Sequence, residues 1–366
     1  MNYSFFITGF PGFLASSLIK QMICDYREKI NHMYLLILPS QKELAESTLN
    51  EIVNQAGIAT ELFTIMTGDI TKEDIGLDPK ILEELSQQVT HVFHLAAIYD
   101  LAVPQETAYQ VNVNGTKNVN NWLSNLRKLQ RYIYYSTAYV SGKREGKIFE
   151  DELKKGQEFR NHYEHTKYLA EILVQDIMEK IPTTIIRPGV VKGHSKTGET
   201  IKFDGLYFQL NVLDKLKFLP IIPYFGKGTA EGNFVPSDYV LEATSYLAIH
   251  PIGEGKTYHL TDPKPYKMWE LQKMLTKEYL GRVPKGRIPL TAAKASLRLK
   301  PIRKWLQAEV EALDYFTIHS SYDCSQATRD LEGSGIGCPD IKDTLEPMVS
   351  FYRKYKDDSS KHIKIT

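Results

Sequence analysis

The chain has 366 residues, 42% hydrophobic and 24% charged, which is the composition of a globular protein and not of a disordered one. Its 45 basic and 44 acidic residues give a net charge of +1, which argues against broad electrostatic binding of nucleic acid and leaves room for a local phosphate site. Cys24, Cys324 and Cys338 show no disulfide or metal-ligand spacing, so we expect no metal site and a cytoplasmic, reducing compartment. With neither a signal peptide nor a run of 18 apolar residues, no membrane-spanning helix is expected.

The first half alternates short apolar runs with longer amphipathic stretches. The runs predict strands at Ser4–Thr8, Met33–Leu38, Leu62–Met66, His91–Leu95, Arg131–Tyr135 and Thr183–Arg187. The stretches between them predict helices at Leu14–Tyr26, Lys42–Ala56, Ile81–Gln88, Thr107–Leu126 and Tyr163–Lys180. This alternation requires crossover connections and therefore a parallel sheet that is covered on both faces. It predicts a Rossmann-type, doubly wound α/β domain over residues 1–191.

The alternation of predicted strands and helices ends at residue 191, and residues 192–232 are rich in Gly, Lys and aromatics. Thr257–Leu260 is predicted as one more strand, and residues 267–320 as mainly helical. The predicted organisation has residues 233–262 returning to the nucleotide-binding domain, 192–232 and 263–354 forming a smaller, mostly helical C-terminal substrate-binding cap, and 355–366 forming a polar, frayed tail.

A glycine-rich segment follows the first predicted strand and opens the first helix. Glycines at such a turn let the backbone approach a pyrophosphate, which then rests on the helix N-terminus. The spacing is Gly-x-x-Gly-x-x-Ala, where the small Ala15 suffices for packing. Dinucleotide contacts are predicted from Thr8, Gly9, Pro11, Gly12, Phe13 and Leu14. A strand–turn–helix that needs glycines only for its geometry is the alternative.

Residues at the ends of other predicted strands are further candidates for contacts with the cofactor. Asp69, with Ile70 beside it, ends the third strand, where a carboxylate can meet an adenine amine or cap a helix. Ala96 and Ala97 follow the fourth strand, where small residues let the chain pass close to a cofactor.

The end of the second strand bears on the choice of cofactor. An acidic residue there binds the ribose of NAD, and an arginine receives the 2′-phosphate of NADP. Leu38-Pro39-Ser40-Gln41-Lys42 contains neither. Ser40 and Lys42 can hold a phosphate, so NADP(H) is favoured over NAD(H), although a solvated Lys42 is equally compatible with the pattern.

Tyr163 and Lys167 open the helix after the fifth strand and share one helix face. A nearby ammonium favours the phenolate, so such a pair can exchange a proton with a carbonyl or alcohol oxygen. Ser136 and Thr137 end the fifth strand, where a hydroxyl can donate to a substrate oxygen. Taken singly, the pair is also compatible with an ordinary amphipathic helix start, and the hydroxyls with a turn.

The combined set resembles the extended short-chain dehydrogenase/reductase family. The motifs that carry the resemblance are Thr8-Gly9-x-x-Gly12-x-x-Ala15, Gly68-Asp69, His94-Leu95-Ala96-Ala97, Asn112-Val113-Asn114-Gly115-Thr116, Ser136-Thr137, Tyr163-x-x-x-Lys167 and Arg187-Pro188-Gly189. The resemblance implies that Thr137 is the catalytic hydroxyl, Tyr163 the acid/base and Lys167 its partner, which also holds the nicotinamide ribose. It further implies cofactor contacts at Asn114, Pro188, Val190 and Val191.

Within that family the chain is most similar to the branch of fatty acyl-CoA reductases, male-sterility proteins and thioester reductase domains. Ser136-Thr137-Ala138-Tyr139-Val140 and the run from Arg187 to Gly198 carry this similarity. One departure is Leu38, where the branch usually has the arginine that reads NADP. The similarity implies reduction of a hydrophobic acyl thioester, aldehyde or ketone, with the substrate free or held on coenzyme A or a carrier protein.

Two segments beyond residue 191 bear on the substrate. The apolar Leu216–Phe225 suits an acyl chain, and is equally compatible with core packing or a homodimer contact. The basic residues between Lys285 and Lys304 suit phosphates of coenzyme A or of a carrier arm, or form a solvated helix face. The alternative functions are an NAD-dependent nucleotide-sugar epimerase or dehydratase, a steroid-type dehydrogenase, and a nucleotide-sensing regulator without catalysis.

Overall fold

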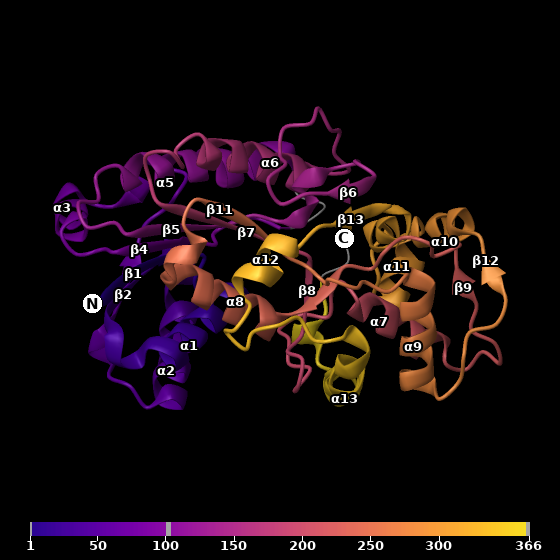
Figure 1. Ribbon diagram of the computed structural model, residues 1–366. Coiled ribbons are helices and arrows are strands. Elements are labelled where there is room, and N and C mark those ends of the chain that lie inside the picture. The colour runs from indigo at the N-terminus through magenta and orange to yellow at the C-terminus, as the bar shows by residue number, and fades with distance from the viewer. Residues whose placement is uncertain (1, 100–103, 364–366) are drawn as a thin grey trace.

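The computed structural model describes residues 2–99 and 104–363 and is built on one central sheet (Figure 1). Seven strands lie in the order β3-β2-β1-β4-β5-β7-β11, and all are paired in parallel. They are β1 (Tyr3–Thr8), β2 (Ile30–Ile37), β3 (Phe63–Thr67), β4 (His91–His94), β5 (Arg131–Tyr135), β7 (Thr183–Pro188) and β11 (Lys256–Leu260). The strand order reverses between β1 and β4, so the carboxyl ends of these two strands flank the crevice where doubly wound sheets bind ligands. The predicted Rossmann-type fold is confirmed.

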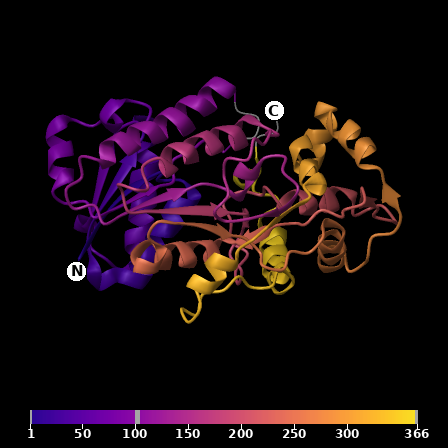
Figure 2. The same cartoon turned by 45° about the horizontal axis from the view of Figure 1, so that its top comes forward.

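Helices cover both faces of the sheet (Figure 2). One face packs against α1 (Phe13–Tyr26), α2 (Lys42–Ala56) and α8 (Ser237–Ile249), and the other against α3 (Pro79–Ser86), α5 (Gly115–Leu123) and α6 (His162–Gln175). Successive side chains of β1 point to opposite faces of the sheet, so Phe5 belongs to one buried core and Phe6 to the other. Burial on both faces is why these strands are continuous apolar runs in the sequence.

A separate hydrophobic core, which includes Phe203, Tyr207 and Leu271, holds the cap together. The cap comprises α7 (Tyr207–Leu216), β9 (Tyr224–Phe225), α9 (Met268–Leu280), β12 (Arg287–Ile288), α10 (Leu290–Leu297), α11 (Lys300–Leu306), the 3-10 segment Val310–Thr317 and α13 (Leu345–Tyr355). Shorter elements complete the chain: α4 (Gln105–Ala108), β6 (Gly146–Ile148), β8 (Val190–Lys192), β10 (Phe234–Pro236), β13 (Ser320–Tyr322) and α12 (Ser325–Asp330). Strand β8 pairs with β10, β9 with β12, and β6 with β13. No helix within the described ranges is both long and apolar enough to cross a membrane.

The helix predicted over Thr107–Leu126 is interrupted. The structure has α4, a wide π-helical turn at Tyr109–Asn114, and then α5. Gly115 lies so close to Ile70 that an added Cβ would come within 2.7 Å of its Cδ1 atom. The side chain of Asn112 is bonded to the backbone of Ile98, so the turn is shaped by contacts outside the helix that periodicity does not reveal.

Two segments of the C-terminal part also differ from expectation. Helix α12, predicted as part of the cap, packs against β11, where Asp330 accepts hydrogen bonds from Lys256 and Tyr258 at 2.7 and 2.8 Å. The tail predicted to fray folds back on the chain up to the last described residues. The Phe203 N–H donates to the Lys361 carbonyl at 2.7 Å, and the Phe203 ring packs on His362.

One buried cation is expected to weaken the fold. The Lys192 side chain is 3% exposed, and its ammonium has no hydrogen-bond partner. Burial lowers its pKa from 10.5 to about 8, against the opposing effect of Asp238. The loss of folding stability caused by the buried Lys192 charge is therefore full below pH 8. It decreases as pH rises towards 10.5, because in that window only the unfolded chain still holds the proton. Lys192→Met is expected to raise the free energy of unfolding by about 1–3 kcal/mol at pH 7, measured by urea denaturation.

The exposed Lys20 on α1 provides the control, because Lys20→Met is expected to change stability by less than about 0.5 kcal/mol. A gain from Lys192→Met that is absent at neutral pH, or that grows as the pH is raised, would contradict this account of Lys192.

Candidate active site

The glycine turn lies where β1 and β4 meet. Gly9 has a φ of +91°, and an added Cβ would lie 2.8 Å from the Ala96 nitrogen. A Cβ on Gly12 would lie 2.7 Å from the Gly9 oxygen, so both positions require glycine. Helix α1 begins at Phe13, and the N–H groups of its first turn have no partner within the helix. The glycine turn that the sequence predicts to hold a pyrophosphate, with the small Ala96 beside it, therefore lies at the point where the strand order reverses.

A buried hydrogen-bond chain runs from this turn into the fold. The Thr8 hydroxyl accepts from the Ala96 N–H at 3.1 Å and donates to His94 Nδ1 at 2.8 Å. His94 Nε2 then donates to the Thr116 hydroxyl at 3.2 Å, and that hydroxyl donates to the Asn112 carbonyl at 2.7 Å. Burial, aided by the charge of Lys167, lowers the pKa of His94 to about 3. The imidazole is therefore neutral and positions both strand ends.

The two asparagines of the π-helical turn have different surroundings. The Asn112 side chain binds both backbone groups of Ile98 and donates to the Thr166 hydroxyl of α6 at 3.0 Å. The Asn114 side chain, the predicted cofactor contact, donates to Gln110 at 2.8 Å within its own turn. Asn112 is thus the residue that ties the loop after β4 to helix α6.

The structure brings Thr137 and Tyr163 together. Helix α6 is capped by Asn161, whose side chain accepts from the Glu164 N–H at 2.9 Å, so Tyr163 stands in the first turn. The Tyr163 side chain is half-buried, and burial raises its pKa to about 12 although a hydrogen bond from Thr137 opposes the rise. The phenol is therefore protonated at neutral pH and can act as an acid.

Lys167 lies one turn along α6 and is 3% exposed. Its ammonium donates to the Tyr134 hydroxyl at 2.9 Å and to the Tyr135 carbonyl at 2.6 Å, and lies 4.4 Å from the centre of the Tyr134 ring. Burial lowers the Lys167 pKa to about 7. Strand β5 thus fixes the lysine through Tyr134, a residue that sequence reasoning did not single out.

A fully buried ion pair supports this helix. The Glu171 carboxylate on α6 accepts from the Arg187 guanidinium on β7, with one N–O distance of 2.5 Å, and neither side chain is exposed. The Ser136 hydroxyl also donates to Glu171, so it stabilises this pair and does not act as a second substrate donor. The sequence contained a signal for this role, because Tyr163, Lys167 and Glu171 recur every four residues on one face of the helix.

Most of the other predicted cofactor positions also lie at strand ends. Ser40 and Lys42 are exposed at the start of α2, beside the exposed Leu38. Asp69 uses one carboxylate oxygen to accept from the N–H and hydroxyl of Thr71, and Ile70 is buried. The remaining positions are Ala97 after β4, Pro188 at the end of β7, and the half-buried Val190 and Val191 in β8.

The cap contributes an aromatic side chain that sequence reasoning missed. Tyr315 packs edge-on against Tyr139, with ring centroids 5.6 Å apart, and its raised pKa reflects burial and its proximity to Glu164 and Tyr163. The predicted acyl patch is divided instead: Ile222 is buried in the cap core, while Phe218 is 70% exposed. Tyr315 is therefore a cap side chain that lies close to Tyr163.

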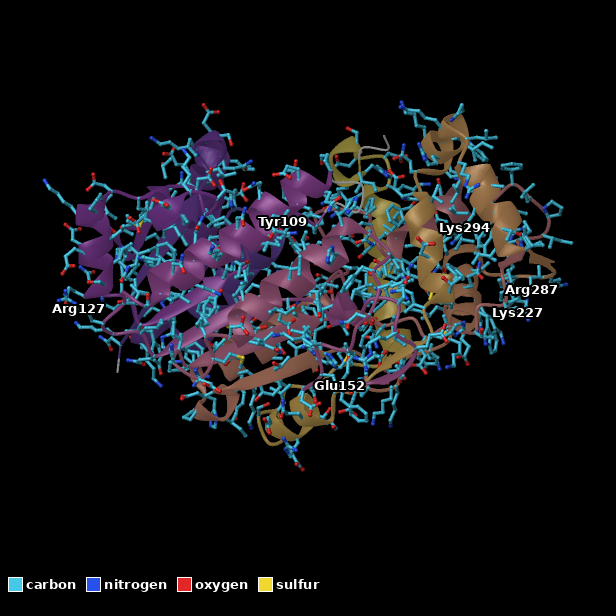
Figure 3. The ribbon with its side chains drawn as sticks, turned by 90° about the horizontal axis from the view of Figure 1, so that it is seen from above. Tyr109, Arg127, Glu152, Lys227, Arg287 and Lys294 are labelled. Atoms are coloured by element: carbon cyan, nitrogen blue, oxygen red, sulfur yellow. The ribbon has the colours of Figure 1, made fainter. Side chains whose placement is uncertain are left out.

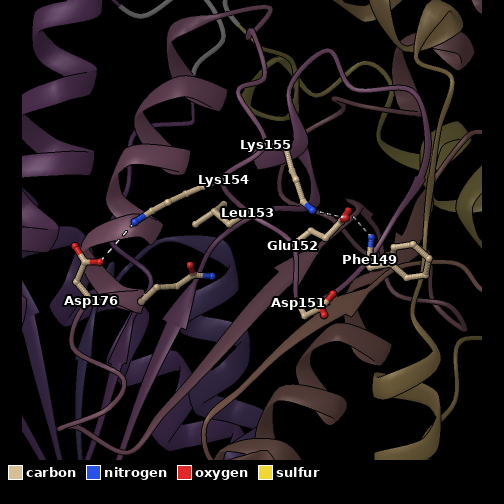
Figure 4. Close-up of a pocket in the computed structure, with 8 residues that line it drawn as sticks. Phe149, Asp151, Glu152, Leu153, Lys154, Lys155 and Asp176 are labelled. Atoms are coloured by element: carbon tan, nitrogen blue, oxygen red, sulfur yellow. Dashed lines mark hydrogen bonds and ion pairs between the residues drawn. The ribbon is translucent and has the colours of Figure 1, made fainter.

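The open hollow shown in Figure 4 is a separate feature. It lies between the segment from Phe149 to Lys155 and the end of α6. Both of its lysines are paired with carboxylates that line it, Lys155 with Glu152 at 3.0 Å and Lys154 with Asp176 at 3.7 Å. None of the predicted site residues lines it.

Comparisons with known proteins identify relatives of the chain. A chloroplastic fatty acyl-CoA reductase 2 of Arabidopsis thaliana is 24% identical over 71% of this chain and 52% of that protein. The nonribosomal peptide synthetase asaC of Aspergillus flavus is 24% identical over 94% of this chain and 36% of that protein, so the chain spans only part of these relatives' length. The crystal structure of the terminal R domain of the myxalamid PKS-NRPS pathway superposes with a TM-score of 0.80 at 22% identity, covering 99% of this chain and 93% of that one.

The family described as male sterility protein, an NAD-binding family, matches residues 7–244. This range contains the glycine turn, the Thr137–Tyr163–Lys167 group and the Glu171–Arg187 pair. The chain belongs to the male sterility protein family.

Proposed function

We propose that the chain is an NAD(P)H-dependent reductase that adds hydride to the carbonyl carbon of a hydrophobic substrate. The observation that carries the proposal is the half-buried Tyr163 phenol, which stands against Thr137 with the Lys167 ammonium one helix turn away. A raised phenol pKa keeps the proton in place at neutral pH, which suits the reductive direction.

The residues present fit a dinucleotide. The Gly9–Gly12 turn and the first turn of α1 would hold its pyrophosphate, Asp69 its adenine, and Lys167 its nicotinamide ribose. When bound, NAD(P)H supplies the hydride. Tyr163 donates its proton to the carbonyl oxygen as negative charge develops there, and Thr137 hydrogen-bonds the same oxygen. The Lys167 charge and the N-terminus of α6 then stabilise the phenolate that remains.

The substrate class we propose is an acyl group bound as a thioester to coenzyme A or to a carrier protein, with aldehydes as the next candidates. The support is that one relative is a fatty acyl-CoA reductase and another is a nonribosomal peptide synthetase. The test follows NADPH oxidation with acyl-CoAs, acyl-carrier thioesters, aldehydes and ketones, and product formation from UDP-sugars, whose epimerisation or dehydration consumes no NADPH. Turnover of acyl-CoA or acyl-carrier thioesters supports the proposal, and turnover of UDP-sugars alone overturns it.

We further propose NADP(H) as the cofactor, because the end of β2 has no acidic residue before α2 and Ser40 and Lys42 are exposed there. Lys42→Ala is expected to raise the KM for NADPH about 5–10-fold and to leave that for NADH nearly unchanged, since only NADPH carries the 2′-phosphate. The exposed Lys20→Ala is the control. An equal effect of Lys42→Ala on both cofactors, or a clear preference for NADH in the unmodified chain, would refute this assignment.

A further inference from the structure

One end of the cap is strongly basic. Eight Lys and Arg residues and no Asp or Glu occur from Arg282 to Ala308, a segment that we call the basic end. The chain as a whole carries +1, so the remainder carries −7. The cations are Arg282, Lys285, Arg287, Lys294, Arg298, Lys300, Arg303 and Lys304. Such an asymmetric charge distribution orients a molecule towards a negatively charged surface.

The basic end lies opposite α3 along the length of the molecule (Figure 1). It comprises the loop after α9, then β12, α10 and α11. Figure 3 shows Arg287 and Lys294 at this end, together with Lys227, while Arg127 marks the other. The Lys294 ammonium is paired with Asp314 at 2.5 Å, and this contact ties α10 to the segment that carries Tyr315. The basic end therefore belongs to the part of the cap that reaches the proposed site.

Large apolar side chains are exposed among these cations. Leu299 is 58% exposed and Trp305 47%, and both lie at or within helix α11. Lys300 and Lys304 are also exposed and share one face of α11, whereas Leu306 packs towards the cap core. An exposed tryptophan and an exposed leucine next to lysines match the composition of surfaces that enter the boundary of a bilayer.

We propose that the basic end docks the protein on a bilayer that contains anionic phospholipid. A planar layer of phosphates can meet cations spread over a loop and two helices at once, while Leu299 and Trp305 enter the acyl boundary. A bilayer is favoured over an acidic protein partner because the cations are accompanied by the exposed Leu299 and Trp305, which the acyl boundary of a bilayer can bury. The inference does not depend on the proposed reaction, and its readout is binding.

The test measures binding of the full chain to vesicles at low ionic strength. Vesicles of phosphatidylcholine with phosphatidylglycerol are expected to bind the chain, and vesicles of phosphatidylcholine alone are not. In a Trp269→Phe background, where Trp122 is buried, vesicle binding is expected to shift the Trp305 emission to shorter wavelength. Lys300→Glu with Lys304→Glu is expected to weaken binding at least about 25-fold, because each surface lysine contributes about fivefold.

The matched control is Lys80→Glu with Lys128→Glu, two exposed lysines at the α3 end, which is expected to bind almost as the unmodified chain does. Circular dichroism confirms that both double variants are folded. The proposal is overturned if anionic vesicles do not bind, if the control loses as much binding as the Lys300/Lys304 variant, or if Trp305 emission does not move. It is likewise overturned if the chain binds an acidic carrier protein through Lys300 and Lys304 but does not bind vesicles.

Discussion

Replacing Tyr163 by phenylalanine is expected to lower kcat for carbonyl reduction by about 10²–10⁴-fold. The substitution removes the proposed proton donor and keeps the ring, so helix α6 and the Lys167 contacts to β5 remain. The dissociation constant for NADPH is expected to change less than about threefold, because the proposed pyrophosphate cradle lies on β1 and α1. The measurements are steady-state NADPH oxidation with the best substrate and a fluorescence titration of NADPH.

Tyr168 provides the matched control, since it lies on the same helix and packs on Phe159, 4.9 Å between ring centroids. Tyr168→Phe should turn over within about twofold of the unmodified chain, as expected for a conservative change away from the chemistry. A Tyr163→Phe enzyme that keeps more than about a tenth of kcat would remove this residue from the acid role. A nucleotide-sensing regulator would show no turnover to lose.

The sheet was predictable because its strands are buried on both faces. Arg131–Tyr135 was predicted with the bounds that the structure shows, and so was the helix Lys42–Ala56. The pairing of Tyr163 and Lys167 was equally predictable from the sequence, because the two residues are one helix turn apart. These features depend on local periodicity, which a sequence displays directly.

Features that depend on tertiary approach were not predictable in the same way. His94 acts through Thr8 and Thr116, which come from β1 and α5, and nothing local in the sequence signals that contact. Tyr315 contacts Tyr139 only because the cap segment Val310–Thr317 packs against the turn after β5. The wide turn at Tyr109–Asn114 likewise arises from the contacts of Asn112 with Ile98 and Thr166, against a helical pattern that predicted a continuous helix.

The Glu171–Arg187 pair links the elements that position the proposed site residues. Arg187 also donates to the Glu150 carbonyl at 3.1 Å, so one guanidinium links α6, β7 and the segment after β6. Both charges are fully buried and are stable there only as partners. Because Lys167 lies one turn before Glu171, displacement of this pair would move the lysine away from Tyr134 and Tyr135.

Glu171→Gln is therefore expected to lower the free energy of unfolding by about 3–5 kcal/mol, because the guanidinium of Arg187 stays buried without its counter-charge. Urea denaturation measures the loss, and kcat should fall with it as Lys167 loses its position. Glu158→Gln, which breaks an exposed pair with Lys143 at 3.0 Å, should cost less than about 1 kcal/mol.

Replacing Glu171 and Arg187 together by methionine should recover most of the lost stability without restoring turnover, since no buried charge then remains and the fixed position of α6 is not rebuilt. If the double variant were no more stable than Glu171→Gln, the unpaired charge would not be the cause of the loss.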